Sequence, residues 1–223
     1  MKTKFYAIVP AAGSSGRMGT PKLLLPWPAS SDGFPTNSQN DSAEDSHLII
    51  DRVLTAWTNS QVDATIVIVR RNDSGLLAAC RRFPVEIVSP EVDPADMKGS
   101  IQAGLECVQQ RYSPSDQDHF LVAPADLPLL SSALIDAVIN FDAAPGQVVV
   151  PRFADKAGHP VMLPWSLAAN VAALSPSEGL DVLISRSVVV GPRMAAQLRV
   201  ADIDTPQEYR AALERAKERI EAP

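Results

Sequence analysis

The residues most able to do chemistry stand together in a loop near the start of the chain. Residues 10–22 read Pro-Ala-Ala-Gly-Ser-Ser-Gly-Arg-Met-Gly-Thr-Pro-Lys and follow an apolar run directly. The small side chains let the backbone approach a flat or charged ligand, and consecutive amides in such a loop can form an anion nest. The guanidinium of Arg17 adds a forked donor and the ammonium of Lys22 a compact charge. Together they suit a triphosphate.

The glycines of this loop give it a conformational role and also exclude two better-known phosphate loops. Gly16 and Gly19 are expected to supply the positive φ angles that a folded loop needs. The spacing of Gly13, Gly16 and Gly19 does not spell the dinucleotide fingerprint GxGxxG. Lys22 is not preceded by glycine and followed by Ser or Thr, as it would be in a Walker loop.

Two carboxylates further along the chain are candidates for metal binding. Asp126 follows a predicted buried strand, at the sheet edge where open α/β sheets bind ligands. A carboxylate there suits Mg²⁺, which takes one or two protein ligands plus substrate phosphates. Asp204 is either a second metal ligand or, in the run Asp204-Thr205-Pro206, the cap of the last helix. No Cys/His spacing typical of zinc is present.

The elements that position these residues alternate along the chain. Apolar runs of strand length alternate with segments of helical period, which predicts a single α/β domain over residues 1–223. We expect a doubly wound, Rossmann-like three-layer sandwich with a mostly parallel sheet. The expected strands are Phe5–Pro10, Ala64–Arg70, Val85–Val88, Phe120–Ala123, Gln147–Val150 and Val161–Leu163. The expected helices are Leu48–Trp57, Gly75–Phe83, Gly99–Gln110, Ser131–Phe141 (capped by Ser131 or Ser132) and Pro206–Ala222.

Composition narrows the class of protein. The net charge is −6 and no basic stripe is visible, which argues against a nucleic-acid binder. No apolar stretch approaches the ~20 residues that span a bilayer, and no signal peptide is readable, so we expect a soluble cytoplasmic protein. Residues 27–46 are polar and rich in Pro, Ser, Asn and Asp. Such a segment buries too little apolar area to offset its ordering, so we expect a flexible surface insertion.

The first loop resembles the signature loop of the MobA-like nucleotidyltransferases, which include the molybdenum cofactor guanylyl- and cytidylyltransferases. Their pattern runs approximately Leu-Ala-(Gly/Ala)-Gly-x-Ser-x-Arg-Met-Gly-x-x-Lys. Later segments resemble further family motifs in the right order, at residues 97–105, 123–129, 157–161 and 202–209. Residues 177–181, Ser-Glu-Gly-Leu-Asp, depart from the Gly-Asp-x-Gly spelling that is common in the cytidylyltransferase branch. The resemblance therefore bears more strongly on the reaction than on the acceptor.

The resemblance implies a nucleotide-diphospho-sugar transferase-like fold and an Mg²⁺-dependent transfer of a nucleoside monophosphate from a triphosphate to a phosphorylated acceptor. Pyrophosphate would leave, and the catalytic residues would be Arg17, Lys22 and Asp126. The nucleotide would lie against the loop and the third helix, and the acceptor against a later turn. The implied nucleotide contacts are Ala11, Ala12, Gly13, Ser14, Ser15, Gly16, Arg17, Met18, Gly19, Lys22 and Ser100, and the implied acceptor contacts are Gly158, His159 and Pro160.

The identity of the substrates rests on finer features. The Ala-Ala-Gly spelling goes with CTP in the family, and the methyl of Ala12 fills space that guanine would need. One methyl discriminates by only ~10–200-fold, so it does not decide alone. The favoured acceptor is the pterin of molybdenum cofactor, with a molybdoenzyme as a candidate protein partner. The alternatives are a GTP-using guanylyltransferase, the cytidylyltransferase of the methylerythritol phosphate pathway, and a non-catalytic nucleotide- or cofactor-binding chaperone.

Overall fold

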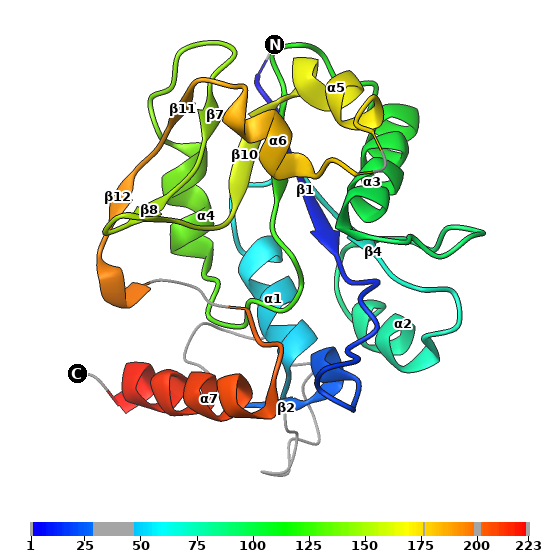
Figure 1. The fold of residues 1–223 in the computed structure, drawn as a ribbon, viewed down its shortest axis with the longest axis vertical. Coiled ribbons are helices and arrows are strands. Elements are labelled where there is room, and N and C mark those ends of the chain that lie inside the picture. The colour runs from blue at the N-terminus through cyan, green and yellow to red at the C-terminus, as the bar shows by residue number, and fades with distance from the viewer. Residues whose placement is uncertain (1, 29–46, 176, 199–201, 222–223) are drawn as a thin grey trace.

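The computed structural model describes residues 2–28, 47–175, 177–198 and 202–221, and its centre is a seven-stranded sheet (Figure 1). The strands are β1 Phe5–Pro10, β4 Ala64–Ile68, β5 Glu86–Val88, β6 His119–Val122, β7 Val148–Val149, β10 Val161–Pro164 and β11 Val189–Val190. Their spatial order is β11-β7-β10-β6-β1-β4-β5. Strand β10 runs antiparallel to its neighbours β6 and β7, and the remaining pairs are parallel. The expected α/β fold with a mostly parallel sheet is confirmed.

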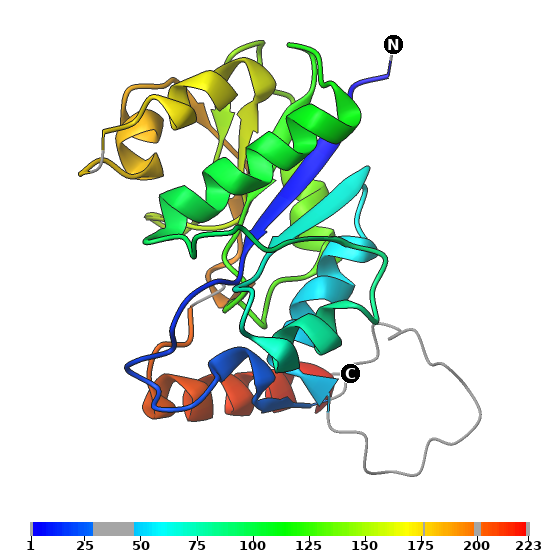
Figure 2. The same cartoon turned by 90° about the vertical axis from the view of Figure 1, so that its right-hand side faces the viewer.

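Helices cover both faces of the sheet, which makes three layers. These helices are α1 Ile49–Thr58, α2 Ser74–Cys80, α3 Met97–Tyr112, α4 Ser132–Ile139, α5 Ala168–Ala172 and α6 Leu180–Ser185, and a further helix, α7 Pro206–Glu221, lies at one end of the molecule. Alternate residues of β1 enter two separate cores: Ala7 and Val9 pack with α1, α2 and α4, and Tyr6 and Ile8 pack with α3, α5 and α6. Figure 2 shows α3 lying along β1 on one side of the sheet. Burial on both faces explains why these strands are continuous apolar runs.

Side-chain caps fix where three of the helices begin. Asp73, Asp96 and Ser131 accept hydrogen bonds from the third residue of α2, α3 and α4, respectively. The cap at Ser131 is one of the two that the sequence predicted. Helix α3 begins at Met97, two residues before the expected Gly99, because the Asp96 carboxylate caps it there.

Several short elements were not predicted. Two-residue strands form a three-stranded sheet from β8 Arg152–Phe153, β9 Lys156–Ala157 and β12 Arg193–Met194, and a pair from β2 Pro26–Trp27 and β3 His47–Leu48. Three 3₁₀ helices are η1 Lys22–Leu24, η2 Trp165–Leu167 and η3 Ala196–Leu198. Trp27, which was expected to begin the polar insertion, is instead a core residue with 4% exposure. Residues 29–46 of that predicted insertion lie outside the described residues.

The last helix closes the lower end of the molecule in Figure 1, beside η1 and β2. The hydroxyl of Tyr209 on α7 donates a hydrogen bond to the carbonyl oxygen of Pro26 over 2.5 Å. The segment before α7 is joined to the turn after β6, because the Ile203 amide donates to the Asp126 carbonyl oxygen. In the described part of the chain, no helix has the length and apolarity needed to cross a bilayer.

Candidate functional site

The predicted loop and Asp126 lie at the same edge of the sheet. Strand β1 sits between β4 and β6, and all three run parallel, so their carboxyl ends meet there. The Ala11 amide donates to the Ile68 carbonyl at 2.9 Å, and the Ala125 amide donates to the Pro10 carbonyl at 3.0 Å. These bonds extend the pairing beyond the strands. They hold the start of the loop and the turn before Asp126 against each other.

The backbone of the loop differs in one detail from the prediction. Gly19 has the expected positive φ, +71°, but Gly16 does not, and Ser15 adopts φ +50° instead. The Ser15 carbonyl accepts hydrogen bonds from the amides of Met18 and Gly19, and its hydroxyl accepts one from the Lys22 amide. These three local bonds stabilise a conformation that is otherwise uncommon for a residue with a side chain. The predicted anion nest would have to use amides of the loop other than those of Met18, Gly19 and Lys22.

Two cations and two carboxylates converge where the loop ends. The ammonium Nζ of Lys22 is 2.6 Å from Asp126 Oδ2 and 2.9 Å from Asp204 Oδ1. Arg17 reaches the other oxygen of Asp204 at 2.6 Å, although its own side chain is 75% exposed. Lys22 and Asp204 are 182 residues apart in the chain. The fold thus brings the sequence-predicted Arg17, Lys22, Asp126 and Asp204 into one cluster.

Partial burial and mutual attraction shift the pKa values in this cluster. Burial lowers the pKa of Lys22, but attraction to Asp126 and Asp204 outweighs it, so the net shift is upward. The hydrogen bond from Lys22 is the largest influence on Asp204 and holds its pKa below the ordinary value, even though burial opposes this. At neutral pH Lys22 is therefore a full cation beside an ionised Asp204.

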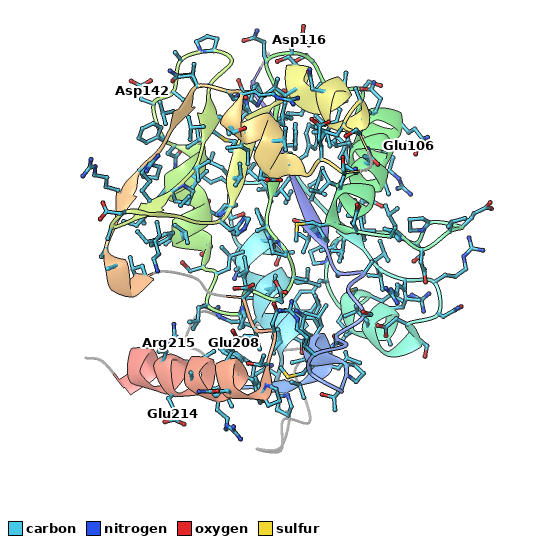
Figure 3. The ribbon with its side chains drawn as sticks, viewed as in Figure 1. Glu106, Asp116, Asp142, Glu208, Glu214 and Arg215 are labelled. Atoms are coloured by element: carbon cyan, nitrogen blue, oxygen red, sulfur yellow. The ribbon has the colours of Figure 1, made fainter. Side chains whose placement is uncertain are left out.

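The side chain of Asp204 faces the cluster and does not cap the last helix. Thr205 performs that role: its hydroxyl accepts from the Glu208 amide at 3.2 Å, and the Glu208 carboxylate accepts from the Thr205 amide at 2.8 Å. This reciprocal pair is a capping box at the start of α7, where Figure 3 labels Glu208. The capping alternative for Asp204 was wrong because the threonine one position later satisfies the same backbone groups. Asp204 is thereby left for Lys22 and Arg17.

Two cavities flank the loop. The first has a volume of about 300 Å³ and extends from Asp126 and Lys22, past the loop, to the start of α3. Of the predicted nucleotide contacts, it is lined by Ala11, Ala12, Gly13, Ser14, Lys22 and Ser100. The second, about 350 Å³, is lined by Gly13, Ser14, Ser15, Gly16 and Gly19, among others, and shares Gly13 and Ser14 with the first. An added Cβ at Gly13 would meet nothing within 4 Å, so this glycine keeps space open for a ligand.

Some wall residues were not anticipated from the sequence. Arg70 lines both cavities, and its Nε donates to the carbonyl oxygen of Ala12 at 2.6 Å. Pro94, Ala95 and Met97 add apolar groups to the lining of the first cavity, and Asp96 lies among them. Arg70 had been assigned to the end of a strand that in fact stops at Ile68. The available signal was its position directly after a buried strand, the same place in a parallel unit that Asp126 occupies.

Other predicted residues lie away from the cavities. The side chain of Met18 is only 7% exposed and packs in the core. Gly158, His159 and Pro160 line neither cavity. An added Cβ at Gly158 would lie 2.5 Å from the Phe153 ring, which gives this glycine a packing role. Burial lowers the pKa of His159, so its ring is neutral at pH 7, within electrostatic reach of Asp126. Its role toward an acceptor stays a prediction.

The carboxylate pair fits a divalent cation. Asp126 and Asp204 already converge on one positive group, the Lys22 ammonium, which marks a position for a cation between them. The second oxygen of Asp126, Oδ1, is buried and has no hydrogen-bond partner in the described part of the protein. Those residues contain no group of three or more His, Cys, Asp or Glu that could hold a metal. Two carboxylates completed by phosphate oxygens and water are a usual set for Mg²⁺.

Comparison with known proteins shows which family the chain resembles. The family model described as the MobA-like NTP transferase domain matches residues 7–191. No curated protein sequence gives a significant match. Solved structures resemble the whole chain: Rv0371c of Mycobacterium tuberculosis in complex with manganese is 24% identical, with a TM-score of 0.70 and coverage of 95% of this chain and 99% of that one.

Two further structures share the fold over similar lengths. A nucleotidyl transferase from Methanothermobacter thermautotrophicus is 17% identical, with a TM-score of 0.75 and coverage of 98% of this chain and 100% of that one. A 4-diphosphocytidyl-2C-methyl-D-erythritol synthase is 18% identical, with a TM-score of 0.70 and coverage of 96% and 99%. At these identities the likeness concerns the fold.

Proposed function

The chain belongs to the MobA-like NTP transferase family and is a nucleotidyltransferase, and from this premise we propose that it transfers CMP from CTP to the phosphate of molybdenum cofactor. The acceptor oxygen forms a new bond to the α-phosphorus of CTP. The bond between the α-phosphorus and the bridging oxygen breaks, and pyrophosphate leaves. A phosphate monoester is already ionised near pH 7, so the reaction needs no general base from the protein.

The observation that carries this proposal is the position of Lys22 between Asp126 and Asp204, at one end of the cavity behind the small-residue loop. Asp126 and Asp204 would hold Mg²⁺, which supplies charge neutralisation at the phosphates when bound. Lys22 and Arg17 then turn toward the β- and γ-phosphates and stabilise the charge that develops on pyrophosphate. Gly13 and Ser14 let the triphosphate approach the backbone.

The choice of CTP rests on the loop. Ala12 is 5% exposed, and its methyl group packs beside the cavity with the side chains under α3. In this proposal the methyl group limits the space for the base, which would favour a pyrimidine over guanine. The choice of a pterin acceptor rests on the sequence resemblance at residues 157–161 and 202–209. A GTP-using guanylyltransferase, the methylerythritol phosphate enzyme and a non-catalytic chaperone are the alternatives that an assay must separate.

A single set of reactions separates the proposed function from these three alternatives. The protein is incubated with Mg²⁺, each of the four triphosphates in turn, and either molybdenum cofactor or methylerythritol phosphate. Pyrophosphate release gives the rate, and the product mass identifies both the nucleotide and the acceptor. We expect CTP with molybdenum cofactor to react. GTP with the same acceptor, or CTP with methylerythritol phosphate, would assign the chain to the corresponding alternative.

Two variants connect the reaction to the site. Asp126→Asn keeps the shape of the side chain but removes its charge, and we expect a loss of ~10²-fold or more in pyrophosphate release. The matched control is Asp116→Asn, on an exposed loop, which should react like the wild type. Nucleotide binding without pyrophosphate release in the wild type, with every acceptor, would support the chaperone and contradict the enzyme.

A further inference from the structure

Arg70 is a cation of the cavity wall that the reaction described above does not use. It follows β4, and the Asp73 amide donates to its carbonyl oxygen in a tight turn. The bond from Arg70 Nε to the Ala12 carbonyl orients the guanidinium plane. Lys22 and Arg17 are paired with carboxylates, whereas the described contacts of Arg70 include no carboxylate. Its two terminal nitrogens therefore remain available to a ligand.

The sheet order shows which part of a nucleotide Arg70 would meet. Asp126 follows β6, the loop follows β1, and Arg70 follows β4, and these are consecutive neighbours in the sheet. Neighbouring strands are about 4.8 Å apart, and one strand separates β6 from β4. Asp126 and Arg70 therefore lie roughly 10 Å apart along the sheet edge. A nucleotide whose α-phosphate lies at Asp126 therefore places its base near Arg70. Pro94, Ala95 and Met97 follow β5, the next strand after β4 in the sheet, and line the same cavity.

Beside Arg70 the cavity wall presents hydrogen-bond donors next to an acceptor. The Arg70 terminal nitrogens are donors in a planar fork, and the adjacent carbonyl oxygen of Ala12 has a second lone pair free to accept. The pairing edge of cytosine presents two adjacent acceptors, O2 and N3, followed by the N4 amino donor. Uracil presents a donor at N3, which faces the donor fork, and an acceptor at O4, which faces the carbonyl.

We propose that Arg70 and the Ala12 carbonyl form the base-reading edge of the nucleotide site and select cytosine over uracil. Arg70 donates to O2 and N3 of cytosine, and Ala12 accepts from N4. This inference rests on the proposed use of CTP and adds the residue that enforces it. Guanine offers an acceptor pair, O6 and N7, to the same fork, so exclusion of guanine depends on the space taken by Ala12.

Binding measurements test this without knowledge of the acceptor. Calorimetric titrations with Mg²⁺ and CTP, UTP or inorganic tripolyphosphate are made on the wild type and on Arg70→Met, which keeps a side chain of similar length but has no donors. We expect the CTP-to-UTP preference to fall by ~10–100-fold, the range for loss of one bidentate base contact. Tripolyphosphate, which has no base, should bind within about twofold of the wild type.

Two further variants control for charge and for folding. Arg70→Lys keeps the charge but loses the fork, so it should show an intermediate loss of preference. Arg71→Met removes the exposed neighbouring arginine and should change nothing. Equal weakening of all three ligands in Arg70→Met would show that Arg70 only braces the loop, and an unchanged CTP-to-UTP preference would show that it does not contact the base. Both results overturn the inference. A wild type that does not prefer CTP over UTP would instead overturn the proposed nucleotide, and the role of Arg70 with it.

Discussion

Replacement of Lys22 by methionine should strengthen metal binding in the absence of nucleotide and weaken nucleotide binding. The Lys22 ammonium lies 2.6 and 2.9 Å from the two carboxylates that we assign to the metal, so it occupies the place of a cation. A divalent ion must displace it or bind beside it. Methionine has a similar length and no charge, so it removes the competitor and leaves both carboxylates in place.

The size of this effect can be worked out from the charges. Two unit charges about 4 Å apart interact by about 1 kcal/mol in water, and a divalent ion doubles this to roughly 2 kcal/mol. We use the value for water because the flexible side chain can swing toward solvent. A difference of about 2 kcal/mol corresponds to a roughly 30-fold tighter binding of Mn²⁺ or Mg²⁺. CTP with its metal should bind ~10²-fold more weakly, because a phosphate contact is lost.

The assay is the titration of Mn²⁺ followed by electron paramagnetic resonance, on the protein without nucleotide. Lys156→Met, which removes an exposed lysine from β9, is the matched control and should bind Mn²⁺ like the wild type. Arg17→Met should give a smaller gain than Lys22→Met, since Arg17 is mostly exposed and touches one carboxylate only. Equal or weaker Mn²⁺ binding by Lys22→Met would refute the reasoning that lysine and metal compete for one place.

Three other predictions concern the loop, the core and the dependence of the unfolding free energy on pH in acid. Gly13→Ala should melt within about 2 °C of the wild type but bind CTP at least ~10-fold more weakly, because its methyl would enter the open cavity. Gly104→Ala should lower the free energy of unfolding by about 1–3 kcal/mol in urea, because its Cβ would lie 2.7 Å from the Ile8 side chain. Asp204, whose pKa is lowered mainly by the Lys22 hydrogen bond, stabilises the fold above about pH 4. That stabilisation is lost as the pH falls through the lower pKa of the folded state, so Asp204→Asn should flatten the fall in unfolding free energy below about pH 5.

Each of these has a result that would contradict it. Gly13→Ala with unchanged CTP affinity would mean that the nucleotide does not approach this backbone. Unaltered stability of Gly104→Ala would mean that α3 can move away from β1 at little cost. For Asp204→Asn, the same dependence of the urea midpoint on pH as in the wild type would show that the carboxylate is not stabilised by Lys22 in solution.

The parts of the candidate site whose residues are close together in the chain could be predicted from the sequence. The loop from Ala11 to Lys22 and the turn at Asp126 each follow a buried strand, and strand ends in a parallel sheet share one edge. The sequence could not decide whether Asp204 binds a metal or caps the last helix. The run Asp204-Thr205-Pro206 fits the local pattern of a helix start whether Asp204 or Thr205 is the capping residue. Only the fold, which brings residues 182 positions apart together, shows that Thr205 caps and that Asp204 meets Lys22.

The features missed from the sequence depend on tertiary context. Arg70 was assigned to the end of an expected strand and belonged to no motif, so its position directly after a buried strand was the available signal. Its place in the cavity comes from the register of β4 beside β1. Ser15 takes the positive φ that was expected at Gly16, because three local hydrogen bonds hold it there. The two-residue strands β2, β3, β8, β9, β11 and β12 and the short helices α5 and α6 are below the length at which periodicity can be read. Their positions are set by packing against longer elements.

The most direct test of the central claim is a crystal structure of the protein with CTP and Mn²⁺, in which anomalous scattering locates the metal. The account predicts an anomalous peak held by Asp126 and Asp204, with the α-phosphate at the same ion and the Lys22 ammonium moved onto the phosphates. A Mn²⁺ ion bound elsewhere, or a triphosphate bound while Lys22 keeps both of its carboxylate contacts, would contradict it.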